Sequence, residues 1–310
     1  MTRHKILVAV DFEEHSLQAL EHSYHLANVF NAEIILLYVI EPIPGFSKFL
    51  FPDDYINKIV SHVREKMDEL EELAKKAEAS TRVPVASIIV KGKPYEKILE
   101  IAKDYGVLMI VMGKSSIIDK KKRKYLGSNT YNVVRDAHCP VISIKGGKLS
   151  HEFNNILVPV DLSKDFGNQI KTAIEIGNYF GATINVLFVF SGENKVSRIL
   201  KQAQLNQIKE EVTKHGLICN TETLNTSSNH AVGNIIINYS HKINADLIVM
   251  LTQQKKVVTE FFVGSVAQNV IHNSDIPVLT IMPNADFNTG ILHNFVDPMG
   301  IIEEKKNKNN

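Results

Sequence analysis

The fold is decided by residues 4–40, HKILVAVDFEEHSLQALEHSYHLANVFNAEIILLYVI, because the chain repeats this stretch 150 residues later. The second copy is NNILVPVDLSKDFGNQIKTAIEIGNYFGATINVLFVF, residues 154–190, and it aligns without a gap. Eleven of the 37 aligned positions are identical, and they include Asp11 and Asp161 directly after the first apolar run. Self-similarity over this length indicates a duplicated domain.

The ends of the two halves repeat as well. VLMIVMGK (107–114) matches DLIVMLT (246–252), YLGSNTYNVV (125–134) matches FVGSVAQNVI (262–271), and CPVISIK (139–145) matches IPVLTIM (276–282). We therefore expect two domains, residues 1–146 and 153–284, joined by the hydrophilic linker GGKLSHEFN (146–154). Residues 285–310 form a C-terminal extension that ends in EKKNKNN, and we expect this end to be disordered.

Within each half, short apolar runs alternate with segments of helical periodicity. Residues 5–10, 33–40, 85–90, 107–113 and 140–145 are expected as strands, and residues 16–30 and 94–104 as helices. A third helix should bury one stripe from Ile56 through Met67 to Ala77, and a fourth should start near Gly127. The alternation predicts an α/β fold in which each half is a five-stranded parallel sheet with helices on both faces.

Composition excludes several classes of protein. With 44% hydrophobic and 22% charged residues the chain can bury large cores, and a net charge of +1 argues against nucleic acid as a partner. Cys139 and Cys219 fit neither a disulfide framework nor paired zinc-ligand spacing. Because we find neither a signal peptide nor an apolar run long enough to cross a bilayer, we expect a cytoplasmic protein that does not engage a membrane.

Three features at the carboxyl ends of expected strands could carry chemistry, since open α/β sheets bind ligands at that edge. The first is Asp11, which recurs as Asp161; a ligand site and a turn or capping role both explain it. The second is Gly127 with Ser128, Asn129 and Thr130, where free N–H groups and hydroxyls at a helix start can donate to phosphate oxygens.

The third feature is Gly113, followed by the cationic run KKKRK at residues 120–124. Such a run next to a phosphate cradle could hold a triphosphate, but a solvated loop is the commoner explanation. Other candidates are weaker. His15, His22 and His25 are interpreted as surface histidines and Cys139 as a small buried thiol, and the chain contains no GxSxG, HExxH or Walker motif.

Together these residues resemble the universal stress protein family, here as a tandem pair of domains. The resemblance rests on the strand-Asp opening, the strand IVMG, the Gly-Ser helix start and the closing Pro-Val strand. It implies an adenine nucleotide alpha-hydrolase-like sheet of order 3-2-1-4-5, dimerisation through the last strand and, in one branch, binding of ATP or AMP.

In that branch the motif is Gly, two residues, Gly, nine residues and then Gly-Ser or Gly-Thr. The first half has Ser116 where the second glycine stands in the family, and one residue more before Gly127. The resemblance assigns Asp11 and Val39 to the adenosine end, and Gly113, Ser116, Gly127, Ser128, Asn129 and Thr130 to the phosphates. The second half has Leu251 and Gln254 at its two loop glycine positions, so the same mode of binding is not expected there.

Two functions stay open on the sequence. One is a stress-response regulator that binds an adenine nucleotide in the first domain, with at most slow ATP hydrolysis. The other is a nucleotide-free module that presents a surface to a protein partner. In either case we expect the apolar last strands, Val141–Lys145 and Val278–Met282, to pair the two domains within one chain, with or without a homodimer.

Overall fold

The apolar runs become the strands of one continuous sheet in the computed structural model of the chain. The structure describes residues 3–41, 53–114, 127–145, 152–163, 166–191, 195–252 and 263–282. In the first half the elements are β1 (His4–Ala9), α1 (Glu14–Val29), β2 (Ala32–Ile40), α2 (Asp53–Thr81), β3 (Val85–Lys91), α3 (Pro94–Asp104), β4 (Met109–Gly113), α4 (Ser128–Asp136) and β5 (Val141–Ile144). In the second half they are β6 (Asn155–Val160), α5 (Gly167–Phe180), β7 (Thr183–Ser191), α6 (Lys195–Lys214), β8 (Cys219–Thr226), η1 (Asn229–Ala231), α7 (Val232–Lys242), β9 (Leu247–Leu251), α8 (Ser265–Asn273) and β10 (Val278–Ile281).

Local sequence signals set the ends of several elements. Pro94 opens α3, where its missing N–H costs no helical hydrogen bond, and Gly106 follows the helix with φ of +56°. Gly216 has φ of +80° just after α6, as expected for the glycine that ends that helix. The predicted helix at residues 94–104 is therefore confirmed.

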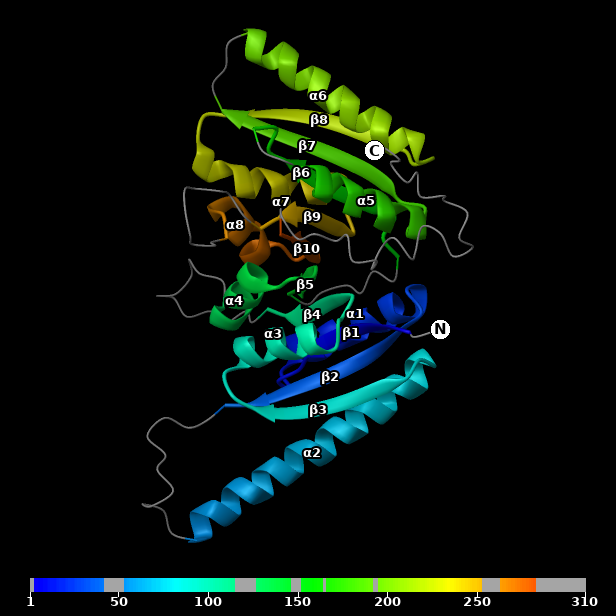
Figure 1. Ribbon diagram of the computed structural model, residues 1–310. Helices are drawn as coiled ribbons and strands as arrows, with labels where there is room; N and C mark the ends of the chain where they lie inside the picture. The colour runs from blue at the N-terminus through cyan, green and yellow to red at the C-terminus, as the bar shows by residue number, and fades with distance from the viewer. Residues whose placement is uncertain are drawn as a thin grey trace, which may run out of the picture.

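The sheet has the order β3-β2-β1-β4-β5-β10-β9-β6-β7-β8, so each half has the order 3-2-1-4-5 and the two last strands meet in the middle. All pairs within a half are parallel, whereas β5 and β10 are antiparallel, with Ile142 opposite Leu279. The predicted pairing of the halves through their last strands is confirmed. Figure 1 shows the result as an elongated molecule with α2 at one end and α6 at the other.

Helices cover both faces of the sheet, as predicted. One buried cluster joins the sheet to α1, α2, α5 and α6, through residues such as Leu20, Leu70, Ile174 and Leu205. The other joins it to α3, α4, α7 and α8. Within the described residues, no helix combines the length and the apolar character needed to cross a membrane.

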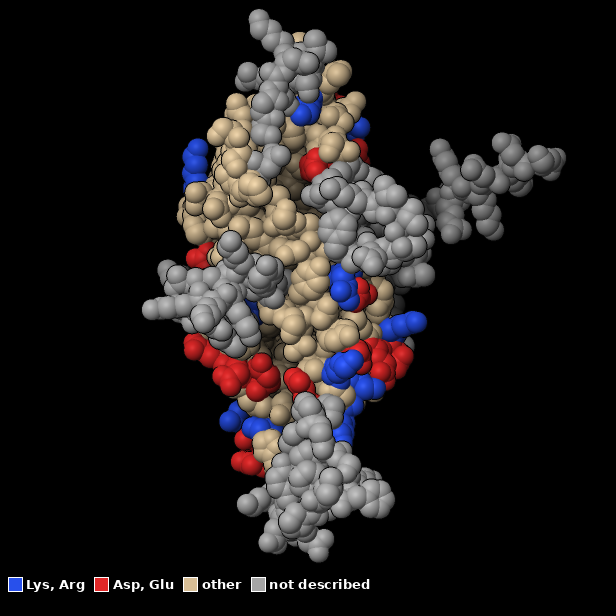
Figure 2. All heavy atoms as spheres, turned by 90° about the vertical axis from the view of Figure 1, so that its left-hand side faces the viewer, with Lys and Arg blue, Asp and Glu red and all other residues tan. Residues whose placement is uncertain are grey.

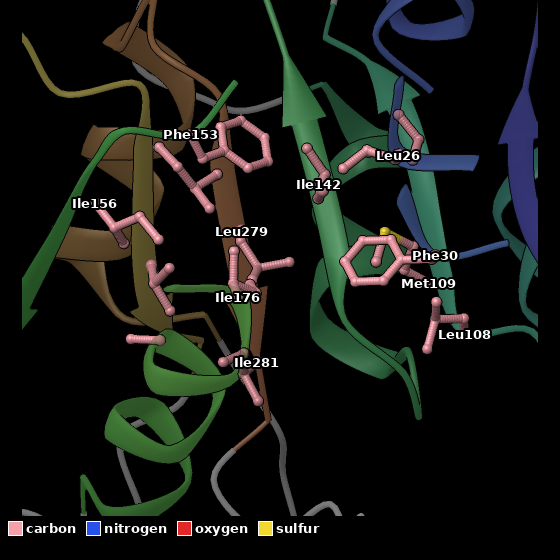
Figure 3. Close-up of a cluster of buried hydrophobic side chains, with 14 of the residues drawn as sticks. Leu26, Phe30, Leu108, Met109, Ile142, Phe153, Ile156, Ile176, Leu279 and Ile281 are labelled. Atoms are coloured by element: carbon pink, nitrogen blue, oxygen red, sulfur yellow. The ribbon is translucent and has the colours of Figure 1, made fainter. Parts of the chain in front are cut away.

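Two expectations about burial were wrong. Met67, placed on the buried stripe of α2, has 45% of its surface exposed, and the first turns of α2 extend beyond the sheet in Figure 1. Phe153, assigned to the hydrophilic linker, is only 6% exposed and its ring lies 5.0 Å from that of Phe180. Figure 3 shows Phe153 among apolar side chains of both halves beside β5 and β10, so the second half is anchored before its first strand begins.

Candidate functional site

The sheet topology brings the predicted site residues of the first half to one edge. Asp11 follows β1, Val39 lies in β2, Gly113 ends β4 and Gly127 caps the start of α4. Since β1 lies between β2 and β4, this is the point where the strand order reverses, and it is the position at which parallel sheets bind ligands. Ser116 and the cationic run 120–124 lie outside the described residues.

Asp11 stabilises the turn that follows β1, which is one of the two roles expected from its position. Its carboxylate accepts a hydrogen bond from the N–H of Glu13 (3.0 Å), and its second oxygen lies 3.4 Å from Nε2 of His15. Partial burial raises the pKa of Asp11, but the interactions with His15, Ser16 and Glu13 outweigh it and lower the pKa to about 2. The bond to Asp11 in turn raises the pKa of His15. Asp11 is therefore ionised at neutral pH and can accept further hydrogen bonds.

The backbone of His15 leaves no room for a side chain at Gly113. A β-carbon on this residue would lie 2.5 Å from the backbone carbon and oxygen of His15 at the start of α1. The sequence interpretation gave Gly113 a role in phosphate approach alone, but the close contact between the end of β4 and α1 already excludes a side chain.

The start of α4 offers hydrogen-bond donors on its solvent-facing side. Ser128 is exposed and Asn129 is half-buried, whereas Thr130 is 4% exposed and faces the interior. The N–H of Tyr131 is the first to bond back within the helix, to the carbonyl of Gly127. The N–H groups before it are those that a phosphate could accept from. Thr130 stays a predicted phosphate contact, and its counterpart Ala267, which is equally buried, lines a cavity in the second half.

In the second half, the matching edge contains a cavity of about 630 Å³. Its lining includes the residues that correspond to the predicted first-half set, namely Asp161, Val189, Leu251, Gly264, Ser265, Val266 and Ala267. This volume is in the range that holds small-molecule ligands. The two halves thus share one set of site positions, and in the second half these residues line one cavity.

Gln169 shapes this cavity, and the sequence interpretation missed it. Pro159 in β6 has no N–H to give to β9, and the register between these strands covers only Ile156 with Leu247 and Leu157 with Ile248. The buried amide of Gln169 donates instead to the carbonyls of Val249 (2.8 Å) and Pro159 (2.9 Å). In the first half the aligned residues are Ala9 and Ala19, and the register between β1 and β4 covers four pairs. The sequence signal for this role was that both aligned positions change together, from Ala9 and Ala19 to Pro159 and Gln169.

Charged and polar groups at the cavity differ from those of the first half. Asp161 accepts hydrogen bonds from the N–H (3.1 Å) and the hydroxyl (2.6 Å) of Ser163, where Asp11 has Glu13 and His15. Lys201 of α6 lines the cavity, and its ammonium lies 4.9 Å from the ring centre of Phe188. The side chain of Leu251 lines the cavity as well. Among the described lining residues, the second half therefore has a cation beside Phe188 and an apolar side chain at the position that corresponds to Gly113.

The remaining candidates have structural roles. His22 is 8% exposed and His25 lies 5.6 Å from the ring of Phe180, so the interpretation of these two as surface histidines was wrong. Cys139 is buried, as expected, and burial raises the pKa of its thiol to about 12, which leaves the reactive thiolate unpopulated. Among the described residues, no group of three or more His, Cys, Asp or Glu side chains could hold a metal ion.

The fold and the cavity define a class of protein: a duplicated α/β domain with a cavity of ligand size at the point where the strand order reverses. The sequence profile of the Universal stress protein family matches residues 2–145 and 152–281. The chain therefore belongs to the universal stress protein family, as a tandem of two such units.

Two relatives are universal stress proteins, and a solved structure shares the fold. The chain is 31% identical to universal stress protein YxiE of Bacillus subtilis (strain 168), over 46% of this chain and 98% of that protein. It is 32% identical to universal stress protein MJ0577 of Methanocaldococcus jannaschii, over 46% and 94% respectively. A crystal structure of a universal stress protein from Archaeoglobus fulgidus DSM 4304 shares the fold over 90% of this chain and 96% of that one, with a TM-score of 0.71 at 24% identity.

Proposed function

We propose that this chain is a cytoplasmic stress-response regulator that binds an adenine nucleotide, ATP or AMP, at the carboxyl edge of its first half. The observation that carries the proposal is the second-half cavity of about 630 Å³, whose lining residues correspond to the predicted first-half set. In the first half Asp11, Val39, Gly127 and Ser128 are identical to their counterparts, and the sequence differs where the phosphates would lie. Gly113 stands in place of Leu251, and Asn129 in place of Val266.

Each end of the site suits one end of a nucleotide. Asp11, with its pKa held at about 2, is an ionised acceptor for ribose hydroxyls. Val39 is half-buried beside the apolar cluster and would contact the base. Gly127, Ser128 and Asn129 would hold the phosphates through the first N–H groups of α4 and the Ser128 hydroxyl.

The second half favours a different role within the same protein. A branched side chain at Leu251 occupies the phosphate end, so we propose that this half serves mainly as the structural and interaction partner of the first. Figure 2 shows Lys, Arg, Asp and Glu gathered on the lower, first-half part of the face that it presents.

Calorimetric titration with ATP and AMP tests the proposal on the wild type, Gly127→Val and Gly264→Val. Both glycines have φ between −52° and −59°, which any L-residue adopts, so valine changes the surface with little backbone strain. We expect the wild type to bind, Gly127→Val to weaken binding at least about tenfold, and Gly264→Val to bind like the wild type. The reverse pattern would move the site to the second half. If the wild type binds neither nucleotide at millimolar concentration, the chain is a nucleotide-free interaction module.

A further inference from the structure

A second cavity lies between α5 and α6. Its volume is about 590 Å³, and its apolar wall is formed by Phe166, Ile170 and Ile174 on one side and Ile208 on the other. The two helices cover the outer part of the second half in Figure 1. A largely apolar cavity of this size has the properties of a small-molecule site.

The matching space of the first half, between α1 and α2, is open as well, with a volume of about 960 Å³, but charged side chains such as Arg64, Glu65 and Asp68 form much of its lining. Gly167 and Ile174 line the cavity, and the aligned residues in α1 are Leu17 and Tyr24. Tyr24 is half-buried and contacts the apolar cluster under α1. The two halves therefore differ in the lining of this space, which is more apolar in the second half.

One polar group inside this lining is unsatisfied. Glu175 lines the cavity, and its Oε2 atom is buried without a hydrogen-bond partner. Burial raises the pKa of Glu175 to about 7, against the opposing effect of Lys171 one turn earlier. A buried carboxyl oxygen without a donor costs free energy, because it has lost its bonds to water and gained none. A ligand that brings a donor to this carboxyl group, after rotation of the side chain turns the oxygen toward the cavity, removes that cost.

We propose that the cavity between α5 and α6 binds a small apolar molecule that carries a protonated amine, with the ammonium on Glu175 and the apolar body against Ile170, Ile174 and Ile208. The ammonium is the fitting group because it offers up to three N–H donors and a charge opposite to that of the carboxylate. The apolar body gains by leaving water for the isoleucine wall. This site is separate from the proposed nucleotide site and does not depend on it.

The test uses 2-phenylethylamine as the probe and 2-phenylethanol as its uncharged counterpart of similar shape. Binding to the full chain is measured by NMR on isoleucine methyl groups. We expect shifts of methyl groups lining the cavity with the amine at millimolar concentration, and binding at least about tenfold weaker with the alcohol and in Glu175→Gln. Glu210→Gln, an exposed substitution of the same kind on α6, should bind the amine like the wild type.

Filling the cavity provides the second arm. Ile174→Tyr and Gly167→Leu each add side-chain volume at the cavity wall, so both should weaken amine binding, and thermal unfolding checks that each variant folds. If one variant fails to fold, the other carries the test.

Three outcomes would overturn the proposal. One is the absence of methyl shifts in the wild type at 10 mM amine, a concentration on the order of a weak fragment's Kd. Another is equal binding of the amine by Glu175→Gln. The third is a change of sedimentation coefficient in Ile174→Tyr, which would identify the cavity as part of an interface between two copies of the chain.

Discussion

The two halves share one sheet order but differ at the residues that surround their strand ends. At three aligned positions the first half has Gly113, Lys114 and Ala19, and the second half has Leu251, Thr252 and Gln169. Each difference changes a contact that the structure shows. Gly113 allows the backbone of His15 to approach closely, Lys114 donates a hydrogen bond from the first half to the second, and Gln169 links two strands. The comparison teaches that duplication preserved the scaffold while the edge of each half acquired its own contacts.

The largest expected effect comes from giving the first half the residue of the second at Gly113. In Gly113→Leu the β-carbon would meet the backbone of His15 at 2.5 Å, so the start of α1 must move. We expect a loss of about 3 kcal/mol in the free energy of unfolding, measured by urea denaturation. Leu251→Ala, at the aligned position, removes side-chain packing without a backbone collision and should cost about half as much. Equal losses would show that the two strand ends do not differ in the way described.

The second prediction concerns Lys114, which reaches from the first half into the second. Its buried ammonium donates to the carbonyls of Ile271 and Ser274, at the C-terminal end of α8, whereas the Thr252 hydroxyl bonds within its own half to Ile281. Lys114→Met leaves these carbonyls without their donor, so we expect a loss of about 2 kcal/mol. Lys171→Met, an exposed lysine, should change stability by less than about 0.5 kcal/mol.

The same lysine should give stability a pH dependence. Burial lowers the pKa of Lys114 to about 7; Lys145 lowers it further and Asp275 opposes the shift. Because the unfolded chain keeps this lysine protonated to about pH 10, it binds more protons than the folded chain between pH 7 and pH 10. The contribution of Lys114 to stability should therefore rise with pH across that window. Urea denaturation at several pH values should show this rise in the wild type and a smaller one in Lys114→Met; equal slopes would exclude Lys114 as its source.

The smallest effect is expected at the Pro159–Gln169 pair. Gln169→Ala leaves the Val249 carbonyl without the donor that replaces the missing N–H of Pro159, at an expected cost of about 1 to 2 kcal/mol. Pro159→Ala together with Gln169→Ala recreates the Ala9 and Ala19 pair of the first half, so the double variant should be more stable than Gln169→Ala alone. A double variant as unstable as the sum of the two single changes would contradict the replacement of one donor by the other.

Much of the fold could be predicted from the sequence because it depends on patterns that are local or repeated. The apolar runs, the helical spacing, Pro94 and Gly106 specify elements within a few residues of themselves. The pairing of the last strands followed from two apolar edges, and the resemblance to the family supplied the strand order. Phe153 was misassigned because its partner Phe180 lies 27 residues further on, where no local pattern points to it.

The candidate site was predictable only in part. The sequence located Asp11, Val39, Gly113 and Gly127 at one edge, because carboxyl ends of parallel strands meet there. It could not give the orientation of Thr130, which depends on how α4 rotates against the sheet, nor the contact that makes Gly113 a glycine. Gln169 was missed since a glutamine in a helix has no special pattern until Pro159 is seen beside it.

The duplication, the α/β class, the chain positions of the elements and the family all followed from the amino-acid sequence. The tertiary structure decided which atoms from distant segments meet: Lys114 with the end of α8, Gln169 with two strands, and the open space beside Glu175. The physical reason is that hydrophobic periodicity reports burial along one element, whereas a hydrogen bond or a cavity depends on the relative placement of several elements to within about 1 Å. That placement is fixed by packing of the whole chain, and two halves with one pattern therefore carry different sites.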